Sequence, residues 1–278
     1  MDELTSLWSI VWRVGLFLTV WGVLLAAPVV LVSKRTPGLI AAYPQQSQVY
    51  FELVTAVAIV AAAWVMARFA DGRAFSTLGF ASTTAVRDVG IGALVGAGWL
   101  ILCLGALWVF GALQPARSIQ LAEPALAWSA AALFVNTVTQ ETLARGYVFQ
   151  TIQTHTNTLW AIAASSVLFA AYHAGAFNGS WLAAINVFLA GVLFASVYLA
   201  SGSLWAPIGL HFAWNLLVGP VLGLTVSGRA SLALGTPALA LRGPDLLTGG
   251  TFGLEGGVIV TVATLLVTGA VAVGSRLG

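Results

Sequence analysis

Charged side chains are scarce in this sequence. Asp, Glu, Lys and Arg make up 7% of its 278 residues, whereas a typical soluble domain carries about 25%. Hydrophobic residues make up 59%. This balance excludes a soluble globular domain and predicts an integral membrane protein in contact with the lipid bilayer. The formal net charge of +2 is also too small to indicate a nucleic-acid-binding protein.

Cysteine is nearly absent as well, since Cys103 is the single one. A disulfide framework within the chain and a cysteine-rich metal site are therefore excluded. The first residues lack the basic region of a secretory signal, and the apolar run that follows extends to Val32, which is too long for a cleaved signal. We expect this run to be the first membrane span.

Long apolar runs divide the chain into about eight segments, and a span needs about 20 residues. The predicted fold class is all-α, a polytopic membrane protein. The expected spans cover residues 8–32, 49–69, 89–113, 123–153, 159–173, 181–200, 204–222 and 256–273.

We expect three parts in the chain. Residues 1–122 hold the first three spans, residues 123–222 form a core that carries the polar motifs, and residues 223–278 hold a loop and the last span. In the first part, Gly92 and Gly96 form a pair that permits close helix approach. Glu52 lies near the expected start of the second span, where a carboxylate complements the positive helix end, so we interpret it as structural.

Ionisable side chains interrupt the fourth expected span. Ionisable groups at bilayer depth are costly and usually mark a functional site. Glu141 and Arg145 are four residues apart, so they share a helical face and can form an ion pair. Gln140 lies about 100° around the helix from Glu141, on a stripe with Asn136. Two adjacent polar stripes predict a helix that faces other helices.

Two later spans carry partners of the right type. His173 ends one of them, and His211 and Asn215 lie one turn apart in the other. A carboxylate and a histidine could activate water as a general base, and His and Asn donors could hold an oxyanion. Glu141 and the two histidines could equally hold a divalent metal such as zinc. These groups fit hydrolysis of a carbonyl compound, most naturally a peptide bond.

Three short motifs together resemble those of the CAAX prenyl protease and bacteriocin-processing family (CPBP). They are Gln140-Glu141-xxx-Arg145, Phe169-xxx-His173 and His211-xxx-Asn215, and the resemblance covers residues 123–222. It implies an all-helical intramembrane endopeptidase that cleaves membrane-associated peptides or proteins. The segment 248–255 resembles bacterial members more weakly, and the expected location is a prokaryotic cell membrane.

The resemblance also implies roles for single residues. A glutamate of the first motif and His173 would activate water, and His211 with Asn215 would stabilise the oxyanion. The family's first glutamate is Gln140 here, and an amide cannot accept a proton from water. Glu141 would then act as the catalytic carboxylate, with Gln140 and Arg145 supporting the site. Metal participation is disputed in the family, and the candidate ligands are Glu141, His173 and His211.

Other interpretations stay open. Glu141 and Arg145 could serve only as an ion pair that fixes the helix among its neighbours. Because of Gln140, the chain could also be a non-catalytic relative that binds a peptide or lipid, for example in immunity or assembly. A small transporter or channel is a third class, since buried Glu, Arg and His can mark ion routes. The sequence shows none of the inverted repeats typical of transporters.

Overall fold

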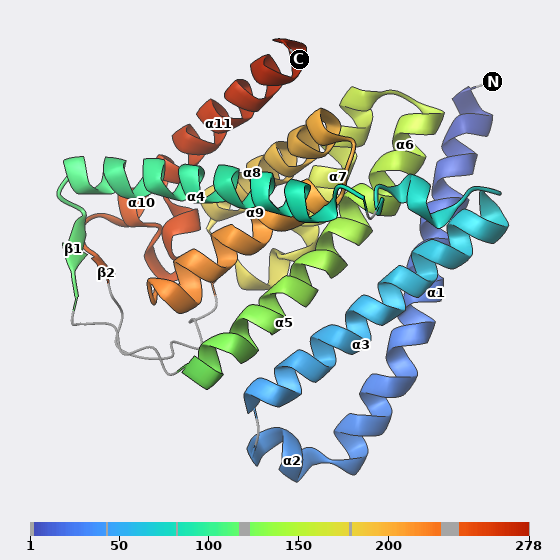
Figure 1. Cartoon of the computed structure of the whole chain (residues 1–278), viewed down its shortest axis with the longest axis horizontal. Helices are drawn as coiled ribbons and strands as arrows, with labels where there is room; N and C mark the ends of the chain where they lie inside the picture. The colour runs from blue at the N-terminus through green and yellow to red at the C-terminus, as the bar shows by residue number, and fades with distance from the viewer. Residues whose placement is uncertain are drawn as a thin grey trace.

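A computed structural model of the chain describes residues 3–42, 44–81, 83–116, 123–177, 180–228 and 239–277. Helices dominate these ranges (Figure 1). The α-helices are α1 (Glu3–Arg35), α2 (Pro37–Ala42), α3 (Pro44–Val65), α4 (Ala85–Val109), α5 (Glu123–Glu141), α6 (Phe149–His155), α7 (Thr158–Tyr172), α8 (Trp181–Ser201), α9 (Trp205–Leu216), α10 (Asp245–Thr248) and α11 (Val258–Leu277).

Shorter elements extend or connect these helices. Strands β1 (Leu113–Pro115) and β2 (Leu239–Leu241) pair antiparallel, with Leu113 opposite Leu241. Turns of 3-10 helix cover Phe75–Leu78, Ala174–Ala176, Gly250–Phe252 and Leu254–Gly256. Turns of π-helix cover Met66–Ala70, Thr142–Val148 and Leu217–Val221, and each of these continues a preceding α-helix without a break.

Five helical stretches are long and apolar enough to cross a membrane: Leu4–Arg35, Gln46–Ala70, Ala85–Val109, Trp181–Ser201 and Val258–Ser275. The prediction of an all-α polytopic membrane protein is thereby confirmed, and five of the eight expected spans are supported. The other three expected segments are helical but shorter or more polar. They are α5 with its continuation through α6, α7, and α9 with its continuation, and they carry the three polar motifs.

The closest helix packing joins α4 to α9. An added Cβ on Gly92 would lie 1.9 Å from the carbonyl oxygen of Ala206, and one on Gly96 would lie 2.6 Å from that of Leu210. From the other side, a Cβ on Gly209 would lie 2.2 Å from the carbonyl oxygen of Val89. The close approach expected from the Gly92–Gly96 pair is confirmed, and its partner is the helix that carries His211 and Asn215.

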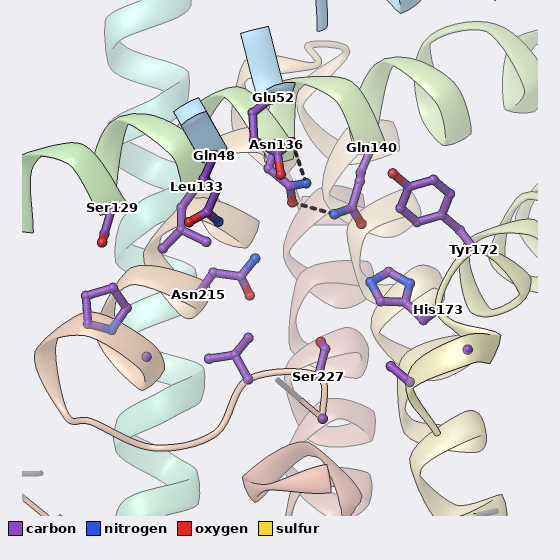
Figure 2. A pocket seen from close by; sticks show the side chains of 16 residues that line it. Gln48, Glu52, Ser129, Leu133, Asn136, Gln140, Tyr172, His173, Asn215 and Ser227 are labelled. Atoms are coloured by element: carbon purple, nitrogen blue, oxygen red, sulfur yellow. Dashed lines mark hydrogen bonds between the residues drawn. The ribbon is translucent and has the colours of Figure 1, made fainter. Parts of the chain in front are cut away.

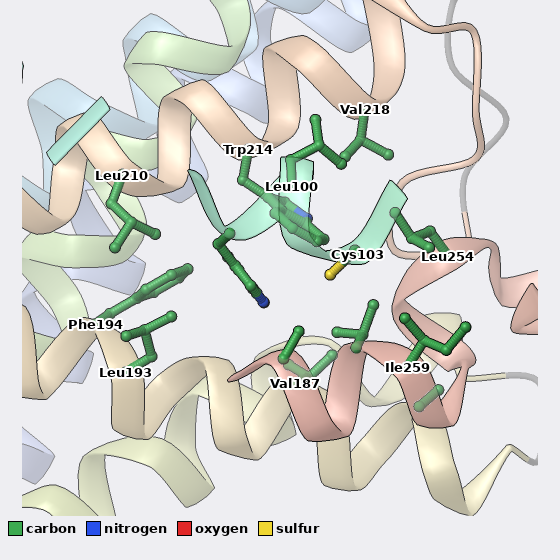
Figure 3. Close-up of a cluster of buried hydrophobic side chains, with 14 of the residues drawn as sticks. Leu100, Cys103, Val187, Leu193, Phe194, Leu210, Trp214, Val218, Leu254 and Ile259 are labelled. Atoms are coloured by element: carbon green, nitrogen blue, oxygen red, sulfur yellow. The ribbon is translucent and has the colours of Figure 1, made fainter. Parts of the chain in front are cut away.

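A buried apolar core fills the space between α4, α8, α9 and α11 (Figure 3). The rings of Trp99 and Trp214 stack there with centroids 3.7 Å apart. Leu193 and Phe194 of α8 and Ile259 of α11 complete this side. Dense packing of this kind fixes the rotation of α9, and hence the direction in which its polar side chains point.

The N-terminal helices form a second cluster against the central ones. Phe17 of α1 and Ile59 of α3 are buried with Tyr147 of the π-helical turn and Phe149, the first residue of α6. α3 runs alongside α5, as Figure 1 shows. α3 begins at Pro44, so Glu52 lies more than two turns into the helix. The interpretation of Glu52 as a charge at the helix start is therefore wrong.

Candidate functional site

The helix that carries the first motif changes its winding at the motif itself. α5 ends at Glu141, and residues Thr142–Val148 form π-helix, in which each turn holds an extra residue. All seven residues of this π-helical segment are buried. Such segments occur frequently at functional sites. Here the π-helical segment begins directly after Glu141 and contains Arg145.

Glu141 and Arg145 form a fully buried ion pair. Nη1 of Arg145 lies 3.1 Å from Oε2 of Glu141, and both side chains are 0% exposed. His211 of α9 joins them, with its Nδ1 3.0 Å from Oε1 of Glu141. An ionised carboxylate only accepts hydrogen bonds, so Nδ1 of His211 is the donor. Glu141 is thus held from two sides.

Aromatic rings and a backbone carbonyl complete this buried ionic cluster. Nη2 of Arg145 donates to the carbonyl oxygen of Gly191 in α8, at 2.7 Å. The guanidinium lies 4.6 Å from the ring centre of Phe169 and 5.3 Å from that of Phe194. The ring of His211 stacks on Phe194 at 4.8 Å. The cluster therefore ties four central helices together, which supports the ion-pair interpretation of Glu141 and Arg145.

A separate polar cavity of 630 Å³ opens between α3, α5, the end of α7, and α9 (Figure 2). Its walls combine carboxylate, amide, imidazole and hydroxyl groups with a few small apolar residues. The lining residues are Gln48, Glu52, Ser129, Leu133, Asn136, Gln140, Tyr172, His173, Gly175, Ala176, Asn215, Gly219, Pro220, Val226, Ser227 and Gly228.

The predicted site residues are divided between the cluster and the cavity. Gln140, His173 and Asn215 line the cavity, whereas Glu141 and His211 belong to the buried ionic cluster. Glu141 follows Gln140 directly, and His211 lies one turn before Asn215 on α9. Gln140 and Asn215 therefore line the cavity, and their neighbours Glu141 and His211 form a hydrogen bond in the cluster beside it.

His173 occupies the end of α7, where the chain turns away. Its Nδ1 lies 2.8 Å from the carbonyl oxygen of Phe169, one turn earlier. A carbonyl oxygen only accepts, so Nδ1 carries the proton in the neutral ring and Nε2 is left as an acceptor. In Figure 2 the ring projects into the cavity toward Gln140. An imidazole in this state can accept a hydrogen bond from water.

A line of amide and carboxylate groups crosses the cavity wall from α3 to α5. Nδ2 of Asn136 donates to Oε2 of Glu52 at 2.9 Å, and Nε2 of Gln140 donates to Oδ1 of Asn136 at 2.6 Å. Among the described residues, Oε1 of Gln140 and Oγ of Ser129 are buried without a hydrogen-bond partner. Buried polar groups normally bind a partner, so these atoms mark positions that favour water or a polar ligand.

The expected metal set is not assembled. Within the ranges that the structure describes, no three His, Cys, Asp or Glu side chains come close enough to hold a metal ion. Glu141 and His211 touch each other, but His173 lies in the cavity and does not join them. The residues present therefore do not fit a metal centre built on Glu141, His173 and His211.

The rim of the cavity is fixed by Glu255, the last residue of the segment 248–255, which was not predicted as a site residue. The carboxylate of Glu255 accepts from Nε1 of Trp214 at 2.8 Å and from Oγ of Ser227 at 2.9 Å. The backbone N–H of Ser227 also donates to it. Glu255 thereby joins the rim loop to α9, one residue before Asn215.

Glu52 and Glu255 were both missed as site residues because nothing in their local sequence marks a contact so far away. Glu52 and its partner Asn136 are 84 positions apart, and Glu255 and Trp214 are 41 apart. One signal was available. Gln48 and Glu52 are four residues apart around the start of the second expected span, so they place two polar groups on one face of α3.

The fold and the cavity define a class: a polytopic helical membrane protein with a polar chamber enclosed by its central helices. Residues 122–217 match the family described as Type II CAAX prenyl endopeptidase Rce1-like, which places an Rce1-like domain of the CPBP family in this chain. The match covers about a third of the sequence and includes all three motifs. Comparisons with curated proteins and with solved structures found no match.

Proposed function

We propose that this protein is a membrane endopeptidase that hydrolyses peptide bonds of membrane-associated proteins within the cavity, in a prokaryotic cell membrane. The observation that carries the proposal is the meeting of His173, Gln140 and Asn215 around one polar cavity. The Rce1-like domain supports the same reaction class. A cavity of 630 Å³ has room for a short stretch of extended peptide and a water molecule.

Each group has a role that follows from its chemistry. Nε2 of His173 accepts a hydrogen bond from the attacking water and later returns a proton to the leaving amine. The side-chain amide of Asn215, 7% exposed, donates to the carbonyl oxygen as it becomes an oxyanion. Glu141, Arg145 and His211 act as positioning residues, because their cluster fixes α5 against α9.

The test is cleavage of lipid-anchored peptides by the purified protein in liposomes, read by mass spectrometry. The peptide library should include farnesylated Cys-Ala-Ala-X termini. His173→Ala should lower kcat by at least about 100-fold, which is the usual contribution of a general acid or base. Cleavage that survives this substitution would remove the proposed mechanism.

His155 offers a matched control for the same test. It ends α6 as His173 ends α7, and its Nδ1 makes the same contact to the carbonyl oxygen one turn earlier, that of Thr151, at 2.8 Å. It lies outside the cavity lining. His155→Ala should therefore leave the cleavage rate unchanged within about twofold, so a loss confined to His173→Ala reports the site.

A second candidate function is favoured by Gln140, which places an amide where a carboxylate would serve catalysis. In this alternative the cavity binds a peptide or lipid without cleaving it. Gln140→Glu distinguishes the two. If the natural chain is inert and the substituted chain cleaves the library peptides, the natural protein is a binder. If the natural chain already cleaves and the rate stays the same, the binder is refuted.

A further inference from the structure

Hydrolysis of a peptide bond requires two proton movements, one from water and one to the leaving amine. His173 can serve one of them, and a second titratable group at the cavity would serve the other. Glu141 is poorly placed, because its side chain is 0% exposed and is held by Arg145 and His211. Gln140 cannot accept a proton at all.

We propose that Glu52 is the carboxylate base of this cavity, an inference that rests on the proposed hydrolase function. Among the described residues that line the cavity, Glu52 is the one Asp or Glu. It enters from α3, and Figure 2 shows it next to Asn136, to which it is hydrogen-bonded. It is half-buried, so its carboxylate is accessible to water within the cavity.

The hydrogen-bond line from Glu52 also orients the wall. A carboxylate only accepts, so Asn136 must turn its NH₂ group toward Glu52 and its oxygen toward Gln140. Gln140 must then turn its own NH₂ group toward Asn136. This leaves Oε1 of Gln140, which is buried and has no partner among the described residues, to accept a hydrogen bond from water. The charge on Glu52 therefore fixes the orientation of the Gln140 amide, so that its oxygen is the hydrogen-bond acceptor in the cavity.

The reaction step follows from these placements. A water held by Oε1 of Gln140 and Nε2 of His173 attacks the scissile carbonyl carbon, and a C–O bond forms. Its proton passes through a second water of the cavity to the carboxylate of Glu52, which lines the same cavity, while the carbonyl electron pair becomes the oxyanion held by Asn215. The C–N bond then breaks, its electron pair leaves with the nitrogen, and Nε2 of His173 passes the second proton of the former water from the new hydroxyl group to the amine. The products are a carboxylate and a free amine, and Glu52 releases its proton to the water of the cavity.

The primary test is Glu52→Gln in the full-length protein, reconstituted in liposomes with the lipid-anchored peptide library. The substitution keeps the size and the hydrogen-bonding capacity of the side chain and removes its ability to accept the proton. We expect kcat to fall by at least about 100-fold with little change in KM, and Glu52→Asp to retain part of the activity. Thr55→Ala is the control, because Thr55 lies one turn further along α3 and its hydroxyl bonds within its own helix, to Phe51.

Two further measurements separate a catalytic role from a structural one. Added formate should restore part of the cleavage by Glu52→Ala, because it supplies a diffusible carboxylate to the vacated space, whereas it should not restore cleavage by His173→Ala. Gln140→Glu added to Glu52→Gln should also recover activity, because it returns a carboxylate to the same cavity. A folding defect would respond to neither.

The outcomes distinguish this inference from the function on which it rests. If the natural chain cleaves, His173→Ala is inactive and Glu52→Gln cleaves at the natural rate, the hydrolase stands and Glu52 is not its base. Glu52→Gln and Glu52→Ala could also both be inactive, with no rescue of Glu52→Ala by formate and no rescue of Glu52→Gln by Gln140→Glu. In that case Glu52 is structural and the inference fails. If the natural chain cleaves no library peptide, both proposals fall together.

Discussion

The buried ionic cluster gives the sharpest prediction about stability. Arg145→Met keeps most of the apolar length of the side chain and removes its charge. Glu141 then stays at 0% exposure with His211 as its remaining partner. Removing one partner of a buried ion pair leaves an uncompensated charge and costs about 3–5 kcal/mol. We expect a loss of this size in the free energy of unfolding, together with the loss of the donor to Gly191.

A double-mutant cycle measures the interaction free energy between Glu141 and Arg145 separately from the other effects of each substitution. Glu141→Gln alone leaves the guanidinium without its counter-charge and should also destabilise the protein strongly. Glu141→Gln combined with Arg145→Met removes both charges, so the double variant should be more stable than the sum of the two losses predicts. The assay is reversible unfolding in mixed micelles followed by tryptophan fluorescence, since Trp99 and Trp214 stack in the neighbouring core.

A specific result would refute this reasoning. If the two losses add within about 0.5 kcal/mol, as independent sites do, then Glu141 and Arg145 do not interact in the folded protein. Arg87→Met gives the matched control. Arg87 pairs with Asp88 at 2.9 Å, but its side chain is 67% exposed. Asp88 is buried at 4% exposure but also hydrogen-bonds to Thr84 and Ser203, so the loss on Arg87→Met should be clearly smaller than that on Arg145→Met.

Three other predictions test the packing and the rim. Gly96→Ala should lower the free energy of unfolding by about 1–3 kcal/mol, because its Cβ would meet the carbonyl oxygen of Leu210 at 2.6 Å. Gly98→Ala, on the same helix with nothing within 4 Å of the added Cβ, should not. Glu255→Gln should raise KM of the proposed protease several-fold with a smaller change in kcat, measured by peptide cleavage, since it loosens the contact between Ser227 and Trp214; an unchanged KM would contradict that role. Cys103 is fully buried, so it should react with a maleimide only after unfolding, and rapid labelling of the folded protein would contradict the core packing.

Much of the helical fold could be predicted, because apolar runs of the right length leave few alternatives in a membrane. Each expected span coincides with a helix, and Gly92 and Gly96 indicated close packing before their partner was known. The ends were less accurate. The second helix begins several residues before the expected span, at Pro44, because the polar residues Gln45–Gln48 are compatible with helix outside the apolar run. The change to π-helix after Glu141 left no trace in the apolar pattern.

The candidate site could be predicted only in part, for a physical reason. Sequence motifs indicate which residue types are present, and helical spacing indicates which of them share a face of the same helix. Neither indicates where that face points after packing. Gln140 and Glu141 are neighbours in the chain, yet the first lines the cavity and the second lies in the ionic cluster. Glu52 is added to the cavity by the packing of α3 against α5, which is a tertiary contact.

The cavity wall has a consequence for how this protein can be divided. α3, with Gln48 and Glu52, and the rim at Val226–Gly228 both lie outside residues 122–217. A fragment limited to the matched segment would keep every recognisable motif and lose two sides of its chamber. Exchanging helices α1 to α3 between relatives should therefore alter which peptides are accepted, although the residues of the three motifs stay the same.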